Sequence, residues 1–133
     1  MKVRKAVITA GSPSQRSLPL QTLIDGDGAE KAVLQVVVEE ALRAKVEEIA
    51  VVVQPGDEDT FAKVAGEQAG RITFLTQEES RGYGHALHLA KDFVGSEPFL
   101  HLVGDHLYVS TKGRGCAEHL VRTATEQGCA ISA

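Results

Sequence analysis

Short apolar runs alternate with longer amphipathic segments along this chain. Four of the runs are rich in β-branched residues and almost continuously apolar, which is typical of strands covered on both faces. They read "KAVITAG", "EEIAVVVQPG", "RITFLTQ" and "PFLHLVGD", at residues 5–11, 47–56, 71–77 and 98–105. Because strands that alternate with helices form parallel βαβ units, the pattern predicts an α/β fold, a three-layer α/β/α sandwich around a mainly parallel sheet.

The segments between these runs carry apolar residues at helical spacing. The clearest is 30–45, whose valines also permit a strand locally but whose length favours a helix. Further helices are expected over residues 57–70, 84–96 and 115–128, with Asp57 as the N-cap of the first of them.

Two stretches fall outside this alternation. Residues 11–29 are longer than a usual connection between a strand and a helix, which is typical of functional or mobile loops. Residues 129–133, "CAISA", begin like a fifth strand and go no further. We therefore expect residues 1–133 to be a truncated part of a larger fold, with an open sheet edge that would permit a homo-oligomer.

Composition narrows the class of protein. A chain of 133 residues is most simply one domain with its own core. Its net charge of -4 argues against sequence-independent binding to the phosphates of nucleic acid, so no nucleic-acid partner is expected. No apolar run approaches the ~18 residues that a membrane span needs, so no membrane partner is expected either. The cysteines lack metal-type spacing, which favours a reduced, cytoplasmic protein.

One acidic residue stands where parallel sheets bind ligands. Asp105 follows the apolar run "FLHLVG", and it therefore lies at the carboxyl end of an expected strand. A carboxylate there can hold a hard cation such as Mg2+. The alternative is that Asp105 caps a turn or the next helix.

Several motifs, taken in order, resemble the sugar-1-phosphate nucleotidyltransferases, most closely the UTP-glucose-1-phosphate uridylyltransferases. They are "KAVITAG", then Arg16, Leu18 and Pro19, then "KAVLQVVVEEAL", "VEEIAVVV", "TQEESRGYGHAL" and "EPFLHLVGDHL". The resemblance covers essentially the whole chain, but only the N-terminal, nucleotide-binding portion of such an enzyme. It implies the Rossmann-like fold of nucleotide-diphospho-sugar transferases.

The same resemblance implies an activity. The enzyme would form a nucleotide sugar and pyrophosphate from UTP and a sugar 1-phosphate, with Mg2+ as cofactor. Which sugar 1-phosphate is used, and whether dTTP replaces UTP, stay open. Because only a portion of the family's domain is covered, these residues alone are expected to show no measurable turnover.

The resemblance also assigns roles to particular residues. Arg16 would contact the triphosphate and, with Asp105, would be catalytic, and Asp105 matches the ligand of Mg2+. Lys31 matches a second phosphate-binding lysine. Gln77 and the glycines after it match the segment that reads the uracil edge. The implied nucleotide-binding residues are Ala10, Gly11, Gln77, Gly82, Gly84 and His85.

Two features depart from the family pattern. The phosphate loop reads "GSPSQR" where the family has Gly-any-Gly-Thr-Arg, and Pro13 removes an amide donor. Leu20 stands at the position of an essential phosphate-binding lysine, a loss worth about 1.5–3 kcal/mol. The alternative reading is therefore a degenerate, catalytically inactive domain of the same fold that binds a nucleotide or a partner subunit.

Two other classes with parallel sheets fit less well. A dinucleotide-dependent dehydrogenase would carry Gly-any-Gly-any-any-Gly after the first strand, where this chain reads "GSPSQR". A response-regulator receiver would need an acidic pair there and an aspartate after the third strand. Thr9, Ala10 and Thr76 occupy those positions.

Overall fold

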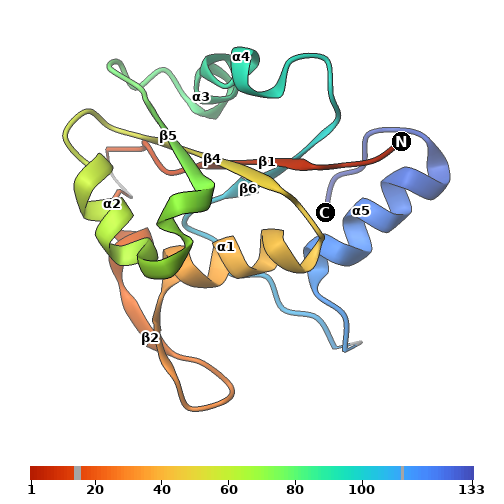
Figure 1. The fold of residues 1–133 in the computed structure, drawn as a ribbon, viewed down its shortest axis with the longest axis horizontal. Helices are drawn as coiled ribbons and strands as arrows, with labels where there is room; N and C mark the ends of the chain where they lie inside the picture. The colour runs from red at the N-terminus through yellow and green to blue at the C-terminus, as the bar shows by residue number, and fades with distance from the viewer. Residues whose placement is uncertain (14–15, 112) are drawn as a thin grey trace.

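The central sheet is parallel. The computed structural model describes residues 1–13, 16–111 and 113–133. Within these residues, four strands form the sheet in the order β5-β4-β1-β6 (Figure 1). All neighbouring strands in it pair in parallel, as predicted. Each strand lies in one of the predicted apolar runs: β1 is Lys5–Thr9, β4 is Glu48–Val53, β5 is Ile72–Thr76 and β6 is Phe99–Val103.

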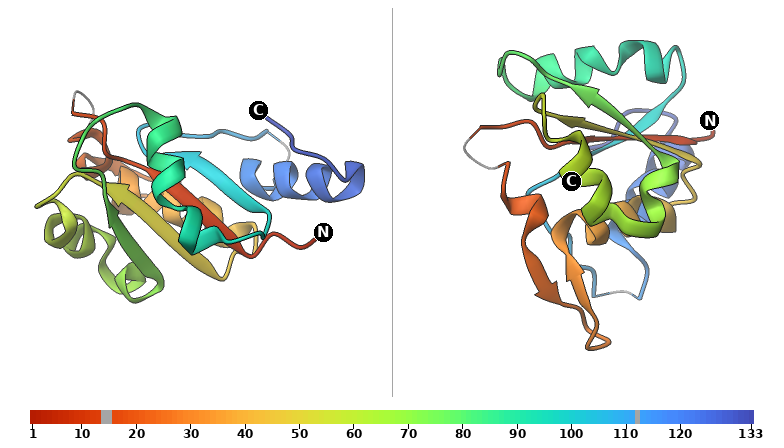
Figure 2. Two further views of the ribbon diagram at one scale, coloured as in Figure 1. Left: turned by 90° about the horizontal axis from the view of Figure 1, so that it is seen from above. Right: turned by 60° about the vertical axis from the view of Figure 1, so that its left-hand side comes forward.

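Helices cover both faces of the sheet, which confirms the three predicted layers (Figure 2). One face carries α1 (Val33–Arg43), α2 (Glu58–Ala65) and α5 (Cys116–Gln127). The other carries α3 (Tyr83–Leu89) and α4 (Lys91–Val94).

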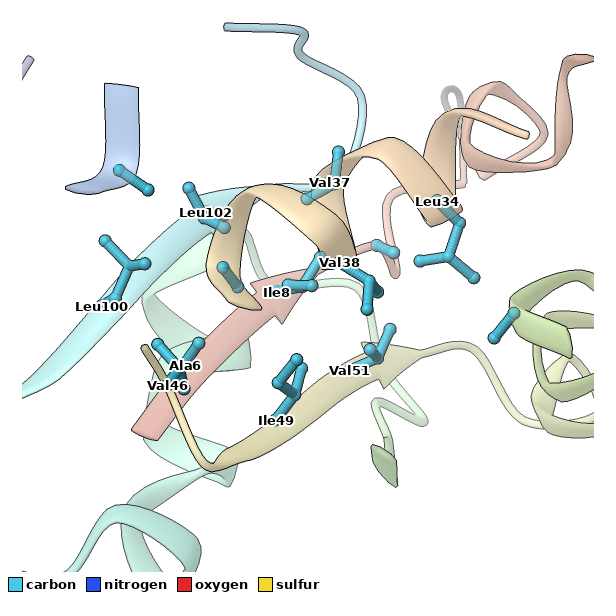
Figure 3. Packing of buried hydrophobic residues seen from close by; sticks show 14 of the residues in the cluster. Ala6, Ile8, Leu34, Val37, Val38, Val46, Ile49, Val51, Leu100 and Leu102 are labelled. Atoms are coloured by element: carbon cyan, nitrogen blue, oxygen red, sulfur yellow. The ribbon is translucent and has the colours of Figure 1, made fainter. Parts of the chain in front are cut away.

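The strands are apolar at successive positions because each face has its own core. On the first face Ile8 and Val51 meet Leu34 of α1 (Figure 3). On the second face Val7 and Val52 meet small residues of α3 and α4. Successive strand residues point to opposite faces, so only a strand buried on both sides needs an unbroken apolar run.

A buried carboxylate joins two helices on the first face. Glu40 of α1 is only 7% exposed, and its Oε1 accepts a hydrogen bond of 2.8 Å from the backbone N–H of Ala117. The N-cap residue of α5 is Gly115, which has no side chain to satisfy the first amides. Glu40 therefore caps α5 from a neighbouring helix.

Residues 16–29 are not a wholly irregular loop, and this corrects the sequence prediction for that part. They contain a short 3₁₀ helix (Leu18–Leu20) and β2 (Thr22–Ile24), which pairs antiparallel with β3 (Glu30–Ala32). The turn between β2 and β3 contains "DGDG", and Gly28 has the positive φ of 83° that such turns require. Because β3 occupies residues 30–32, the helix expected from residue 30 begins at Val33.

Two other predicted helices are interrupted. The helix expected over residues 57–70 ends as an α-helix at Ala65 and continues as a 3₁₀ helix, Gly66–Arg71. Gly66 has a φ of 62°, outside helical geometry. The helix expected over 84–96 is divided into α3 and α4 at Ala90.

The predicted fifth strand is absent, since residues 129–133 adopt no strand conformation. Ile131 is the only β-branched residue there, so the segment has little preference for a strand. It lines an apolar groove of about 700 Å³ together with β6 and α5, and the groove includes none of the predicted site residues. No helix in the described part of the chain has the length and apolar character to cross a membrane.

Candidate functional site

A cavity of about 260 Å³ lies beyond the carboxyl ends of β1 and β6. Five of the predicted site residues line it: Ala10, Gly11, Gln77, Gly82 and Asp105. The structure therefore brings together residues that are far apart in the sequence, at the place where parallel sheets bind ligands. The other lining residues, which the sequence did not indicate, are Thr9, Ser12, Ser80, Tyr83, Ala86, Val103 and His106.

Gly11 and Gln77 are in close contact on the wall of this cavity. A Cβ placed on Gly11 would lie 2.9 Å from Gln77 Oε1, closer than real Cβ contacts allow. The backbone N–H of Gln77 donates to the carbonyl of Val53 at 2.8 Å, which fixes the start of the Gln77 segment to the end of β4. A side chain at position 11 would therefore require the Gln77 side chain to shift.

The Gln77 side chain is held in a defined orientation. It is 4% exposed, and its Nε2 lies 3.2 Å from the carbonyl of Gly82 and 3.1 Å from Nδ1 of His85. Gly82 has a φ of 89°, which favours glycine, and it precedes α3. His85 thus supports Gln77 from the first turn of α3 and does not line the cavity itself. Because Nε2 makes these two contacts, the fixed amide would present Oε1, an acceptor suited to the N–H of a ring.

Two predicted nucleotide-binding residues, Ala10 and Gly84, contribute less to the cavity than predicted. The N–H of Ala10 donates to the carbonyl of Val52 at 2.8 Å, so this amide is not available to a phosphate. Gly84 is exposed in α3 and does not line the cavity.

Asp105 lies at the mouth of the cavity and is 10% exposed through its side chain. Its Oδ1 is 2.7 Å from Nδ1 of His106. The residue before it, Gly104, donates to the carbonyl of Thr9 at 2.9 Å, and a Cβ on it would lie 3.0 Å from that oxygen. The next helix, α5, has Gly115 at its N-cap, so the alternative in which Asp105 caps this helix is wrong. Asp105 does lie in the turn that follows β6, as the other form of that alternative expects.

The donor atoms around Asp105 limit what the site can hold. Within the described residues no group of three histidine, cysteine, aspartate or glutamate side chains is arranged to bind a metal ion. One carboxylate is nevertheless a usual protein share of a Mg2+ site, because this ion takes its remaining ligands from phosphates and water. The donor set fits an ion that arrives with a phosphorylated ligand.

Arg16 does not line the cavity but lies beside it. Its Nη1 donates to Oε1 of Gln54 at 2.9 Å, and its Nη2 lies 2.5 Å from Oδ1 of Asp57. Gln54 Nε2 in turn donates to the carbonyl of Gly11 at 3.0 Å. Asp57 occupies the N-cap position of α2, as predicted, but makes no side-chain capping bond, and its Oδ1 binds Arg16 instead. Of the loop "GSPSQR", residues 14 and 15 lie outside the described residues.

Lys31 is on the β2–β3 hairpin and is not brought to the cavity. Its Nζ lies 2.8 Å from Asp25 Oδ2 and 3.2 Å from Glu39 Oε2. These hydrogen bonds, first to Asp25 and then to Glu39, raise the pKa of the lysine. Leu20, at the position of the expected family lysine, packs against the core.

A second set of contacts supports the cavity from β6. Thr9 Oγ1 is 3.1 Å from Nε2 of His101, and the His101 ring stacks on Tyr83 with centroids 6.0 Å apart. Burial lowers the pKa of His101, which favours a neutral ring against Thr9. These contacts join separate elements, so no local sequence pattern indicated them.

Comparison with known proteins shows the family of the chain. The sequence profile described as Nucleotidyl transferase matches residues 16–131. The UTP–glucose-1-phosphate uridylyltransferases of Staphylococcus haemolyticus (strain JCSC1435) and Staphylococcus epidermidis (strain ATCC 12228 / FDA PCI 1200) are each 30% identical to this chain over 135 residues. These matches cover 82% of this chain and 47% of each relative. The chain therefore spans about half the length of the curated relatives it matches.

Solved structures share the fold. A UDP-glucose pyrophosphorylase complexed with UDP-glucose matches 96% of this chain and 55% of its own, with a TM-score of 0.74 and 20% identity. A UTP-bound UGPase from Acinetobacter baumannii matches 96% of this chain and 54% of its own, with a TM-score of 0.75 and 20% identity. The fold is thus that of these enzymes, and the sequence profile shows that the chain belongs to the nucleotidyl transferase family.

Proposed function

We propose that this chain forms the UTP-binding part of a uridylyltransferase. The complete reaction would convert UTP and a sugar 1-phosphate, with glucose 1-phosphate as the first candidate, into a UDP-sugar and pyrophosphate. The observation that carries the proposal is the placement of the Gln77 amide, Gly11 and Asp105 around one cavity. A nucleoside triphosphate has a base at one end and phosphates at the other. Gln77 would recognise the base, and Asp105, on the other side of the end of β1, would bind the metal ion at the phosphates.

The Gln77 side of the cavity would bind the uracil ring. The ring offers one N–H donor between two carbonyl acceptors, and Oε1 of Gln77 would accept from that N–H, since Nε2 already contacts Gly82 and His85. The Gly11–Gln77 contact leaves no room for a side chain at the wall, so a flat ring can approach the backbone. Gln77 is already fixed through Gly82 and His85, so little side-chain entropy remains to be lost when the ring binds.

The loop after Gly11 and the Arg16 guanidinium would hold the triphosphate. An oxygen of the sugar phosphate attacks the α-phosphorus, and the bond from this phosphorus to the bridging oxygen breaks as pyrophosphate leaves. The protein's part is to align these groups and to balance the phosphate charge. Arg16 is linked to the Gly11 carbonyl through the side chain of Gln54, and its guanidinium would supply positive charge to the phosphates.

Asp105 would hold Mg2+ together with oxygens of the triphosphate. Bound there, the ion would neutralise phosphate charge and orient the α-phosphorus. The low exposure of Asp105 keeps its carboxylate near the cavity, and His106 bonds one of its oxygens and restricts its rotation. The chain itself is acidic overall, so an anionic substrate would gain from a cation at this point.

We expect the protein to act in the cytoplasm, where UTP is available and thiols stay reduced. Cys116 and Cys129, both of them described, form no disulfide, and Cys129 is exposed. The β6 edge of the sheet is the surface through which a homo-oligomer would form.

A second candidate is a degenerate domain that binds UTP without turnover. Leu20 in the core and Lys31 in its ion pairs favour it, since neither supplies the lysine that the family pattern places near the phosphates. Both candidates predict UTP binding, and only the enzyme predicts pyrophosphate release from UTP and glucose 1-phosphate by the complete protein.

Calorimetric titration tests the shared part of the two candidates. UTP should bind the chain more tightly with Mg2+ than without it, and NAD should not bind. Titration of dTTP in the same series decides between the two pyrimidine nucleotides. Absence of UTP binding in the presence of Mg2+ would contradict the proposal.

A further inference from the structure

We infer that Gln54 and Asp57 are positioning residues that hold the Arg16 guanidinium beside the Gly11 loop to receive the triphosphate of UTP. This inference rests on the proposed function, because it assigns a task to residues around the same cavity. Neither residue was indicated by the sequence for this role, and neither lines the cavity.

Gln54 connects Arg16 to the loop through one amide group. Its Oε1 accepts from Arg16 Nη1 at 2.9 Å, and its Nε2 donates to the Gly11 carbonyl at 3.0 Å. Gln54 directly follows β4, so its backbone is anchored by the central sheet. The guanidinium is therefore two hydrogen bonds away from the wall of the cavity, on a rigid support.

Asp57 fixes the other end of the guanidinium. Its Oδ1 lies 2.5 Å from Arg16 Nη2, and its side chain is only 13% exposed. Two partners on different nitrogen atoms define the plane of the guanidinium as well as its position. The N–H groups of the guanidinium that contact neither partner then point in a fixed direction.

The contact with Asp57 is better explained as a support than as a latch that a ligand releases. Oδ2 of Asp57 is buried and has no hydrogen-bond partner among the described residues. If Arg16 moved away, a mostly buried carboxylate would lose its main charge partner, which is strongly unfavourable. Arg16 should therefore keep Asp57 while it binds phosphate through its other N–H groups.

A double-mutant cycle measures whether Asp57 acts through Arg16. UTP with Mg2+, and uridine separately, are titrated into the wild-type chain, Arg16→Gln, Asp57→Asn and the double variant. Uridine lacks phosphates, so a loss confined to UTP locates the effect at the triphosphate. Asp59→Asn is the matched control, because Asp59 is an exposed carboxylate of the same first turn of α2 and its removal changes the net charge equally.

We expect Arg16→Gln to weaken UTP binding by roughly 10-fold or more. Asp57→Asn should weaken it by about 5-fold, within the range of coupling between contacting residues. The double variant should be no weaker than Arg16→Gln alone. Uridine binding should not change, and Asp59→Asn should leave UTP binding within about twofold of wild type. Gln54→Leu, which removes both bonds of the amide, should behave like Asp57→Asn and serves if the latter does not fold.

Three results would overturn the inference while leaving the proposed function intact. Asp57→Asn and Gln54→Leu could leave UTP affinity unchanged, Asp57→Asn could tighten it, or it could weaken UTP equally with and without Arg16. Failure of the wild-type chain to bind UTP would instead overturn the proposed function, and the inference with it.

Discussion

Oε1 of Gln77 lies 2.9 Å from the point that a Cβ on Gly11 would occupy. This contact joins the segment after β5 to the loop after β1, and it defines the wall of the cavity where we place the uracil ring. The two residues come from widely separated parts of the chain. The account of UTP binding depends on their close approach.

Gly11→Ala should therefore weaken UTP binding. The added methyl group must displace the Gln77 amide, which is buried and held by Gly82 and His85. A loss of about tenfold or more is expected, since moving the amide removes a buried hydrogen-bonding group from the ligand. The measurement is a UTP titration, with thermal unfolding to show that the variant is folded. Gly70→Ala is the control, because a Cβ at Gly70 meets open space. Equal UTP affinity for Gly11→Ala and wild type would contradict the proposed wall.

Asp105→Asn should remove the Mg2+-dependent part of UTP affinity. The amide keeps the size of the side chain but binds a hard cation much less well. Binding of UTP without Mg2+ should change little, and the melting temperature should stay close to wild type, because Asp105 caps no helix. Calorimetric titration with and without Mg2+ measures separately the part of the UTP affinity that depends on the ion and the part that does not. A variant that is clearly destabilised yet still responds to Mg2+ as wild type does would show that Asp105 has a structural role only.

Glu40→Leu should destabilise the fold by about 1–3 kcal/mol, because the buried N–H of Ala117 would lose its acceptor. Glu40→Gln retains an acceptor oxygen and should recover most of that loss. Urea denaturation of the two variants measures the free energy of unfolding. UTP affinity should be unaffected in both, since Glu40 lies outside the cavity. If Glu40→Leu and Glu40→Gln lower the free energy of unfolding equally, the hydrogen bond to α5 is not the source of the destabilisation.

Acid should weaken the contact that Glu97 makes with the start of β1. Hydrogen bonds, first from Lys5 and then from Arg4, lower the pKa of Glu97 from 4.5 to about 2. The native state thus favours the ionised form, so this stabilisation is complete above pH 4.5 and is lost as the pH falls from 4.5 towards 2. The urea midpoint of Glu97→Gln should therefore depend less on pH in this window than that of wild type. Glu67→Gln, at an exposed position, is the control and should keep the wild-type pH dependence. Parallel pH profiles for Glu97→Gln and wild type would contradict the assignment.

The sheet was predictable because its strands are buried on both faces and leave unbroken apolar runs. Asp105 and Gln77 were also predictable as residues at the same edge of the sheet, since each follows the carboxyl end of a strand. The β2–β3 hairpin was missed because its strands are short and polar, although "DGDG" is a hairpin-turn signal.

The contacts of Arg16 could not be derived from the sequence. The local sequence predicts that Asp57 caps α2, and it does occupy that position, but a tertiary ion pair takes its carboxylate. In the same way, Ala10 follows the first strand as expected, yet a ladder hydrogen bond to Val52 uses its amide. Such details depend on which strand lies beside β1, and neighbouring strands in a parallel sheet are set by crossovers rather than by local pattern.

Discrimination between UTP and CTP tests the central claim most directly, because these ligands differ only at the edge of the base. The affinity of each is measured with Mg2+ for the wild-type chain and for Gln77→Leu, which removes the amide from the cavity wall. We predict that wild type prefers UTP by about tenfold or more, and that Gln77→Leu loses most of this preference while it still binds the triphosphate. Equal affinity of wild type for UTP and CTP, or an unchanged preference in Gln77→Leu, would contradict the assignment of Gln77 as the residue that reads the uracil edge.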